Sequence, residues 1–224
     1  LYGEFYQLDL EMSFVDEEDV YEVGQKIFYN IFTHFSDKEV SPIPFKRIPY
    51  KEAMLKYGSD KPDLRNPLLI EDLTIILSKS TFEPFKTLNI RGIKVDNIDK
   101  SNSWYKKIEE YIKSLGATGM SYIKVNEDMT FKSSIDKFLT DDLRKELIEK
   151  CHLNKGSALF ILADNKHKID KLAGLLRTKL GNELDLINKN KFEFCIINDF
   201  PMYEYNEEEN TWDFGHNPFS MPKG

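Results

Sequence analysis

The chain has 224 residues, 41% of them hydrophobic and 31% charged, and a formal net charge of −7 at pH 7. This length and apolar content can fill the core of one large domain or two small ones. The longest apolar runs are far shorter than the roughly 20 residues of a membrane-spanning helix, so the composition predicts a soluble protein.

Charge is distributed unevenly along the chain. Residues 88–191 carry 20 Lys and Arg against 15 Asp and Glu, a net charge of +5, whereas the remainder has a net charge of −12. A mildly basic centre between acidic flanks predicts a module inserted into another domain. It favours binding of a polyanion such as RNA only weakly.

About thirteen alternating residues open the chain and predict a strand, on which successive side chains point to opposite faces. The apolar face comprises Tyr6, Leu8, Leu10, Met12 and Phe14. The other face comprises Phe5, Gln7, Asp9, Glu11 and Ser13. This second face is richer in hydrogen-bonding groups than a solvated face needs, although periodicity alone is also consistent with a solvent-facing strand.

Two helices are predicted next. Apolar residues recur every three or four positions over residues 17–35, after acids in the first turn. A shorter helix over residues 50–57 follows Pro49 and ends at Gly58. Pro62 and its turn-forming neighbours cannot continue that helix.

Helices and strands then alternate. Residues 70–85 are expected to form a helix that gives way to a strand. The further helices are predicted at 101–115, 134–139, 141–151 and 167–180, and the strands at 119–126, 157–163 and 192–198, with a hairpin turn near 206–210. The pattern predicts an α+β fold with helices on one face of an antiparallel sheet.

Cys151 and Cys195 are predicted to be reduced thiols, because they lack CxxC spacing. No histidine has zinc-ligand spacing.

Several segments resemble the bacterial-type aspartyl-tRNA synthetases, a family of class II aminoacyl-tRNA synthetases. GEFYQLDLEMSFV resembles the second strand of the family's motif 2, and YGSDKPDLR is a nine-residue signature too specific for chance. INDFPMYEYNEEENTWDFGHNPFSMP resembles the return to the active site. ATGMSYIKVNED and GSALFILADNKHKIDKLAGLLRTKLG resemble the insertion domain. The resemblance covers nearly the whole chain.

This resemblance implies three parts: a partial catalytic domain over 1–87, an inserted α/β domain over 88–191, and a return to the catalytic domain over 192–224. The catalytic parts are expected to contribute to an antiparallel class II sheet. The resemblance also implies that the arginine of motif 2, motif 1, motif 3 and the anticodon-binding barrel lie outside the sequence. We therefore expect a fragment that is inactive by itself.

The implied parent enzyme is an aspartate–tRNA ligase that uses ATP with Mg²⁺ to form aspartyl-adenylate and then charges tRNA(Asp). It is expected to be a cytoplasmic homodimer that does not bind membranes. Charging of tRNA(Asn) is left open, because the family makes that choice largely with the barrel. The alternative hypothesis is a non-catalytic tRNA-binding or regulatory module that shares the insertion-domain fold.

The resemblance also suggests site residues. Phe5 matches an aromatic that stacks on adenine, and Gln7 and Asp9 match residues that face the amino-acid pocket. A carboxylate is a sensible acceptor for a substrate ammonium, although Asp9 could instead pair with a neighbouring cation. Two roles are open for Glu11: it could support the residues around the site, or it could contact the nucleotide.

Three further residues each have two possible roles. His216 resembles the first histidine of a segment that closes over aspartate, but Asn217 replaces the second, and an exposed loop histidine is common. Lys61 and Arg65 could reach tRNA phosphates, or could form salt bridges within the chain. The insertion domain is expected either to contact the tRNA acceptor region or to act as a scaffold.

Overall fold

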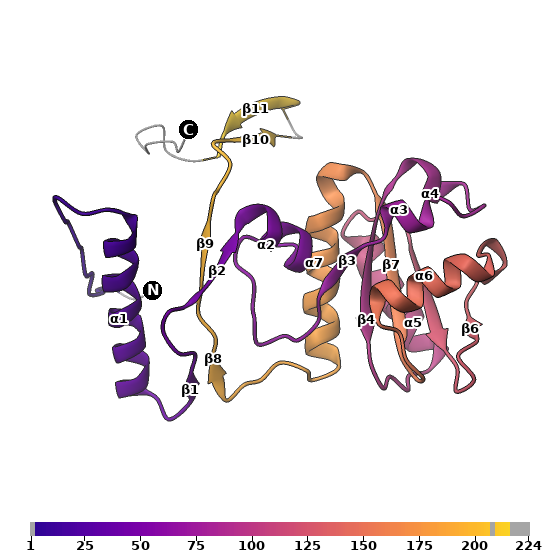
Figure 1. Ribbon diagram of the computed structural model, residues 1–224, viewed down its shortest axis with the longest axis horizontal. Coiled ribbons are helices and arrows are strands. Elements are labelled where there is room, and N and C mark those ends of the chain that lie inside the picture. The colour runs from indigo at the N-terminus through magenta and orange to yellow at the C-terminus, as the bar shows by residue number, and fades with distance from the viewer. Residues whose placement is uncertain (1–2, 207–208, 216–224) are drawn as a thin grey trace. The chain divides into compact units, whose positions relative to one another are not determined.

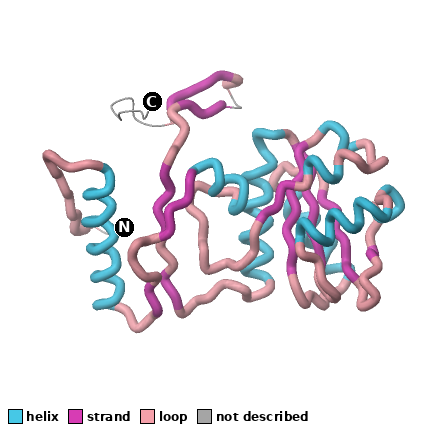
Figure 2. Tube along the Cα trace, viewed as in Figure 1, coloured by secondary structure: helices cyan, strands magenta, loops and turns pink. Residues whose placement is uncertain are grey.

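A computed structural model describes residues 3–206 and 209–215. The chain divides into two compact units, Leu1–Lys46 with Lys189–Ile196, and Arg47–Asn188 with Ile197–Gly224. Figures 1 and 2 trace the elements of each unit. Each unit is described by itself below.

The first unit is built around helix α1, Glu17–Phe35. Asp16 and Asp19 form a capping box at its start, which satisfies two backbone N–H groups of the first turn. Strands β1 (Glu39–Val40) and β8 (Lys191–Phe192) pair in parallel. An aromatic cluster joins α1 to the segments around these strands, and it consists of Phe28, Phe32, Phe45, Phe192 and Phe194. The predicted helix over 17–35 is confirmed.

The prediction of a strand at the start of the chain is wrong. Residues 3–15 have no strand assignment, and Figure 2 draws them as loop. Side chains of both alternating faces are exposed, among them Phe5 at 85%, Leu8 at 67% and Phe14 at 106%. A strand needs a neighbour for its backbone hydrogen bonds, and no other described segment pairs with this one.

A five-stranded antiparallel sheet forms the centre of the second unit, in the order β3-β4-β7-β5-β6. The strands are β3 (Ile70–Asp72), β4 (Asn89–Val95), β5 (Met120–Val125), β6 (Phe131–Lys132) and β7 (Ala158–Asp164). The middle strand, β7, pairs along its length with β4 and over five residues with β5. The predicted antiparallel sheet is confirmed.

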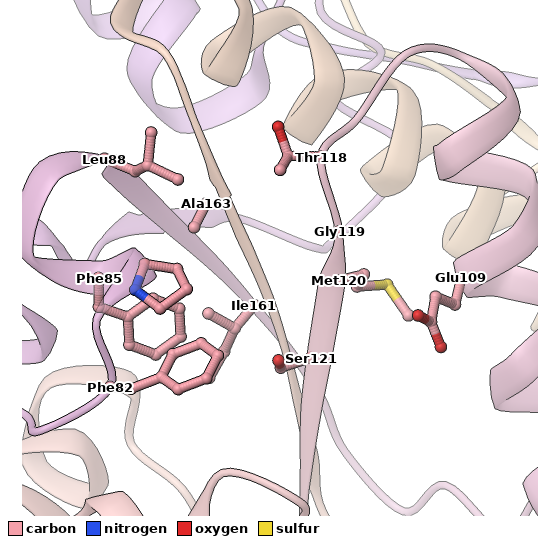
Figure 3. A pocket seen from close by; sticks show the side chains of 11 residues that line it. Phe82, Phe85, Leu88, Glu109, Thr118, Gly119, Met120, Ser121, Ile161 and Ala163 are labelled. Atoms are coloured by element: carbon pink, nitrogen blue, oxygen red, sulfur yellow. The ribbon is translucent and has the colours of Figure 1, made fainter.

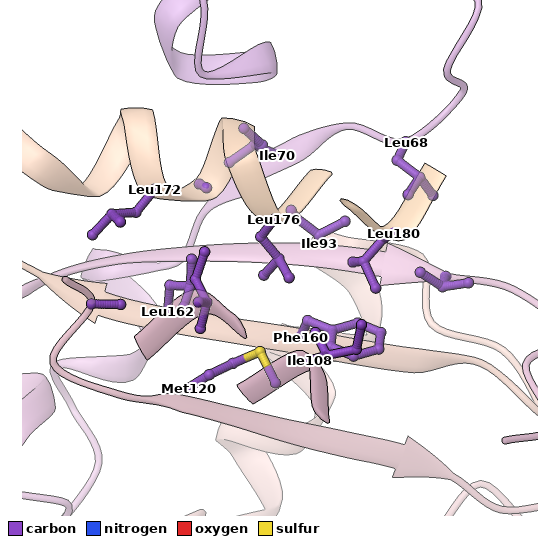
Figure 4. Packing of buried hydrophobic residues seen from close by; sticks show 14 of the residues in the cluster. Leu68, Ile70, Ile93, Ile108, Met120, Phe160, Leu162, Leu172, Leu176 and Leu180 are labelled. Atoms are coloured by element: carbon purple, nitrogen blue, oxygen red, sulfur yellow. The ribbon is translucent and has the colours of Figure 1, made fainter. Parts of the chain in front are cut away.

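Helices cover both faces of this sheet, which corrects the prediction of one covered face. The helices are α2 (Tyr50–Tyr57), α3 (Thr74–Leu77), α4 (Pro84–Thr87), α5 (Asn102–Ser114), α6 (Asp141–Cys151) and α7 (Lys166–Glu183), with a 3-10 turn at Asp136–Phe138. Phe160 and Leu162 of β7 pack with α5 and α7, as Figure 4 shows for α7. Leu159 and Ile161 belong to a second core with α3 and α6. Alternate residues of β7 are buried on opposite faces, so its continuous apolar run reflects a doubly covered strand.

Two boundaries differ from the prediction. In residues 70–85 a strand precedes the short helices α3 and α4, because Ile70–Asp72 pairs with β4. The strand predicted at 192–198 is interrupted, so β8 ends at Phe192 and β9 covers Cys195–Asn198. The hairpin is confirmed as β10 (Tyr203–Asn206) and β11 (Thr211–Phe214). The remaining strand, β2, covers Lys46–Pro49.

The domain boundaries at residues 88 and 191 remain a prediction, because compact units do not identify an insertion. In the described part of the chain, no helix is long and apolar enough to cross a membrane. Cys151 and Cys195 are free, and burial raises the pKa of the Cys151 thiol to about 12.

Candidate functional site

Two of the predicted substrate-binding residues lie together. The Gln7 side-chain amide donates a 2.7 Å hydrogen bond to a carboxylate oxygen of Asp9, as residues two apart in an extended segment can. Phe5 precedes this pair with an exposed ring and has no aromatic contact with another described residue. His216 lies outside the described residues. The structure therefore joins Gln7 to Asp9 and leaves their association with Phe5 and His216 as a prediction.

The signature turn after α2 holds its charged residues in local pairs. Arg65 donates two hydrogen bonds to the Asp63 carboxylate, at 2.9 and 2.8 Å. These two side-chain bonds are the main cause of the lowered pKa of Asp63, and a hydrogen bond from the Arg65 backbone N–H adds to the effect. Lys61 pairs with Asp60 at 2.6 Å but is 83% exposed. The salt-bridge alternative accounts for both cations within the chain.

A buried arginine of α7 ties the signature turn to that helix. Arg177 is 2% exposed and donates to the backbone carbonyls of Leu68, Asn66 and Asp63 at 2.6, 2.7 and 3.0 Å. The Asn66 amide donates back to the Arg177 carbonyl at 3.0 Å. A planar guanidinium suits several fixed acceptors at once. This arrangement gives part of the signature a structural role in packing against α7.

A groove in the second unit lies beside the start of α7. Its volume is about 780 Å³, and it is lined by α2, the residues at 115–116, the first turns of α7 and the β10–β11 hairpin. The Tyr50 hydroxyl of α2 donates to the Glu204 carboxylate at 3.0 Å, and burial together with this bond raises the pKa of Tyr50 to about 12. The His167 and Tyr205 rings stack at 4.9 Å between centroids.

A smaller cavity of about 210 Å³ lies near α4 and the start of β5. Figure 3 shows the Phe82 and Phe85 rings on one side of it and Ile161 on the sheet beside them. The polar groups of this mainly apolar lining are the hydroxyls of Thr118 and Ser121 and the carboxylate of Glu109, which accepts a hydrogen bond from Lys113. The described residues that line it include no Lys or Arg to pair with the phosphates of a nucleotide.

Comparison with known proteins assigns the family. Residues 2–224 match the family model of class II tRNA synthetases (D, K and N). The chain belongs to this synthetase family. The family resemblance predicted from the signature segments is confirmed, and so is the α+β fold class.

The synthetase chain is also similar to three curated proteins, each named aspartate–tRNA(Asp/Asn) ligase. It is 47% identical to the protein of Rickettsia bellii (strain OSU 85-389) and 46% identical to those of Rickettsia canadensis (strain McKiel) and Rickettsia prowazekii (strain Madrid E). Each comparison covers 99% of this chain and 38% of the relative. The chain thus spans well under half the length of these synthetases.

Neither Arg177 nor the groove was predicted from the sequence of this synthetase chain. The groove brings together NKHKIDK at the start of α7 and the alternating aromatics of YEYNEEENTW. Each segment has a pattern that is visible in the sequence: the first is a cluster of basic residues, and the second has aromatic residues at alternate positions. Only the tertiary structure places them side by side, because nearly forty residues separate His167 from Tyr205 along the chain.

Proposed function

We propose that the chain is part of an aspartate–tRNA ligase. The observation that carries this proposal is 47% identity across 99% of the chain to relatives named aspartate–tRNA(Asp/Asn) ligase. In the proposed reaction the aspartate carboxylate attacks the α-phosphorus of ATP, and pyrophosphate leaves. The 3′-terminal hydroxyl of tRNA then displaces AMP from aspartyl-adenylate. Protein groups promote such steps mainly by positioning the reactants and stabilising the charge that develops.

Asp9 is proposed to accept hydrogen bonds from the ammonium group of substrate aspartate. Its carboxylate already accepts from Gln7, which restricts the carboxylate and leaves further lone pairs for a ligand. Phe5 is proposed to stack on adenine, and its exposed ring is open to such a contact. His216 is proposed to hydrogen-bond the substrate carboxylate. These three roles rest on the family resemblance.

ATP is proposed to enter as its Mg²⁺ complex. Within residues 3–206 and 209–215, no three His, Cys, Asp or Glu side chains gather as a metal site, so we assign no metal ligand to this chain. The complete enzyme is further proposed to be a cytoplasmic homodimer that charges tRNA(Asp). Contact of residues 88–191 with tRNA fits their net charge of +5.

Amino-acid activation tests the proposed function directly. ATP–pyrophosphate exchange would be measured on the 224-residue chain and on the longest reading frame that contains it, with aspartate, asparagine, glutamate and lysine. We expect aspartate-dependent exchange by the longer polypeptide alone. Exchange with none of the four amino acids would contradict the proposal and favour a non-catalytic tRNA-binding module.

A substitution tests the role of Asp9. In the longer polypeptide, Asp9→Asn should lower kcat/KM for aspartate by about 10- to 100-fold, because it removes a charge-assisted hydrogen bond worth roughly 1.4–2.8 kcal/mol. Glu4→Gln is the control, since it removes one negative charge from an exposed residue of the same segment. Equal losses in both variants would show a general charge effect and would contradict the assigned role.

A further inference from the structure

The groove beside α7 combines cations with aromatic rings. Lys166 and Lys171 line it, are exposed, and form no ion pair with another described residue. Lys168 lies between them on the same helix and also lines the groove. Glu204 also lines the groove and accepts a hydrogen bond from Tyr50. The two lysines therefore leave positive charge available to an anionic ligand.

The β10–β11 hairpin contributes aromatic residues to the lining of the groove. The strand register places Tyr203 opposite Phe214 and Tyr205 opposite Trp212. Residues opposite each other in a ladder project from the same face of the ribbon, and i and i+2 share it. The ring centroids of these pairs are 5.0 and 5.6 Å apart. The hairpin thus carries two cross-strand aromatic pairs on one face, and the rings of Tyr203, Tyr205 and Trp212 line the groove.

Stabilisation of the hairpin explains these aromatic pairs only in part. Cross-strand pairs do support a two-stranded ribbon, which is marginal in isolation. However, Trp212 is 67% exposed and Tyr203 is 50% exposed, so much of their area remains accessible. Both residues line the groove together with the two lysines.

We propose that this groove binds a single-stranded segment of RNA. Proteins that bind single strands combine cations along the phosphate backbone with aromatic rings on which unpaired bases stack. Lys166 and Lys171 would contact phosphates, while Trp212 and Tyr203 would stack with bases. A duplex fits this arrangement poorly because its bases are already stacked on one another. The choice of RNA over DNA rests on the proposed ligase function, in which tRNA is the substrate.

The experiment measures binding of a fluorescein-labelled single-stranded 12-mer RNA to the 224-residue chain by anisotropy, over a range of salt concentrations. Lys166→Ala/Lys171→Ala should raise Kd at least tenfold. It should also reduce the slope of log Kd against log salt by about 1.4, since each phosphate contact on a single strand contributes about 0.7. The matched control is Lys107→Ala/Lys155→Ala, which removes two exposed lysines outside the groove and should change Kd less than twofold.

Two further variants separate binding from folding. Trp212→Ala should raise Kd about 5- to 100-fold with an unchanged salt slope, because stacking involves no counterion release. Lys166→Arg/Lys171→Arg should retain binding. No binding by the unaltered chain, equal effects of the groove and control lysines, or equal binding of a duplex of the same sequence would each overturn the proposal. Pyrophosphate exchange needs no tRNA, so failure of RNA binding is distinguishable from failure of the proposed function.

Discussion

Single residues of the signature turn perform structural tasks that their charge alone does not reveal. The Asp63 side chain holds Arg65, while its backbone carbonyl accepts a hydrogen bond from Arg177. Truncation of Arg177 would remove a donor from the buried carbonyls of Leu68 and Asn66 and from the partly buried carbonyl of Asp63, and buried carbonyl groups are costly to leave unpaired. The turn is therefore fixed both by a surface ion pair and by a buried guanidinium.

The lowered pKa of Asp63 predicts a pH-dependent contribution to stability. Since the folded carboxyl has a pKa below that of the unfolded chain, its contribution is present above about pH 4 and is lost as the pH falls through the folded pKa. Asp63→Asn should lower the free energy of unfolding by about 0.5–1 kcal/mol at pH 7, because the pair is partly exposed.

Urea denaturation at several pH values measures this difference. It should shrink toward zero in strong acid, where both proteins carry a neutral side chain at position 63. Glu127→Gln is the control, because Glu127 is exposed and has no ion pair within the described residues. A difference for Asp63→Asn that stayed constant down to pH 2 would show that the ion pair is not its source.

At the scale of elements, two glycines set the packing of α2 on α7. Gly58 ends α2 with φ +67°. A β-carbon on Gly58 would lie 2.3 Å from the Asp170 carbonyl oxygen and 2.4 Å from the Gly174 nitrogen. These neighbours are backbone atoms of a helix, so they cannot move aside cheaply.

Gly58→Ala should consequently destabilise the second unit by about 1–3 kcal/mol, since it adds overpacking to a left-handed backbone conformation. The measurement is the urea midpoint at pH 7. Gly119→Ala is the matched control, because a β-carbon there meets no other atom within 4 Å. A Gly58→Ala midpoint equal to that of the control would mean that the two helices are not in such close contact.

At the scale of the whole molecule, burial differs strongly between the units. Helix α1 has one buried residue, Gln25, whereas α7 has eight. Regions that bury little apolar surface open at lower free energy than a packed core. Backbone amides of α1 should therefore exchange with deuterium at least tenfold faster than those of α7, as measured by mass spectrometry of peptides. Equal protection would instead indicate that both helices open only by global unfolding.

Helix positions were the most predictable part of this fold. The helices at 17–35, 50–57, 101–115, 141–151 and 167–180 were confirmed to within a few residues. Their three- and four-residue periodicity and their end signals, such as Gly58, are local in the chain. Burial around α5 depends on tertiary packing instead, since Tyr105 is fully buried while Leu115, just after the helix, is 41% exposed.

The sequence by itself determined the family, the main helices and the candidates Phe5, Gln7, Asp9 and His216, because motifs and periodicity are local patterns. Only the tertiary structure decided which strands pair, that both faces of the sheet are covered, and that Arg177 holds the signature turn. It also decided that the lysines of α7 and the aromatic residues of the hairpin line one groove. Pairing and burial depend on contacts between residues far apart in the chain, which no short pattern encodes.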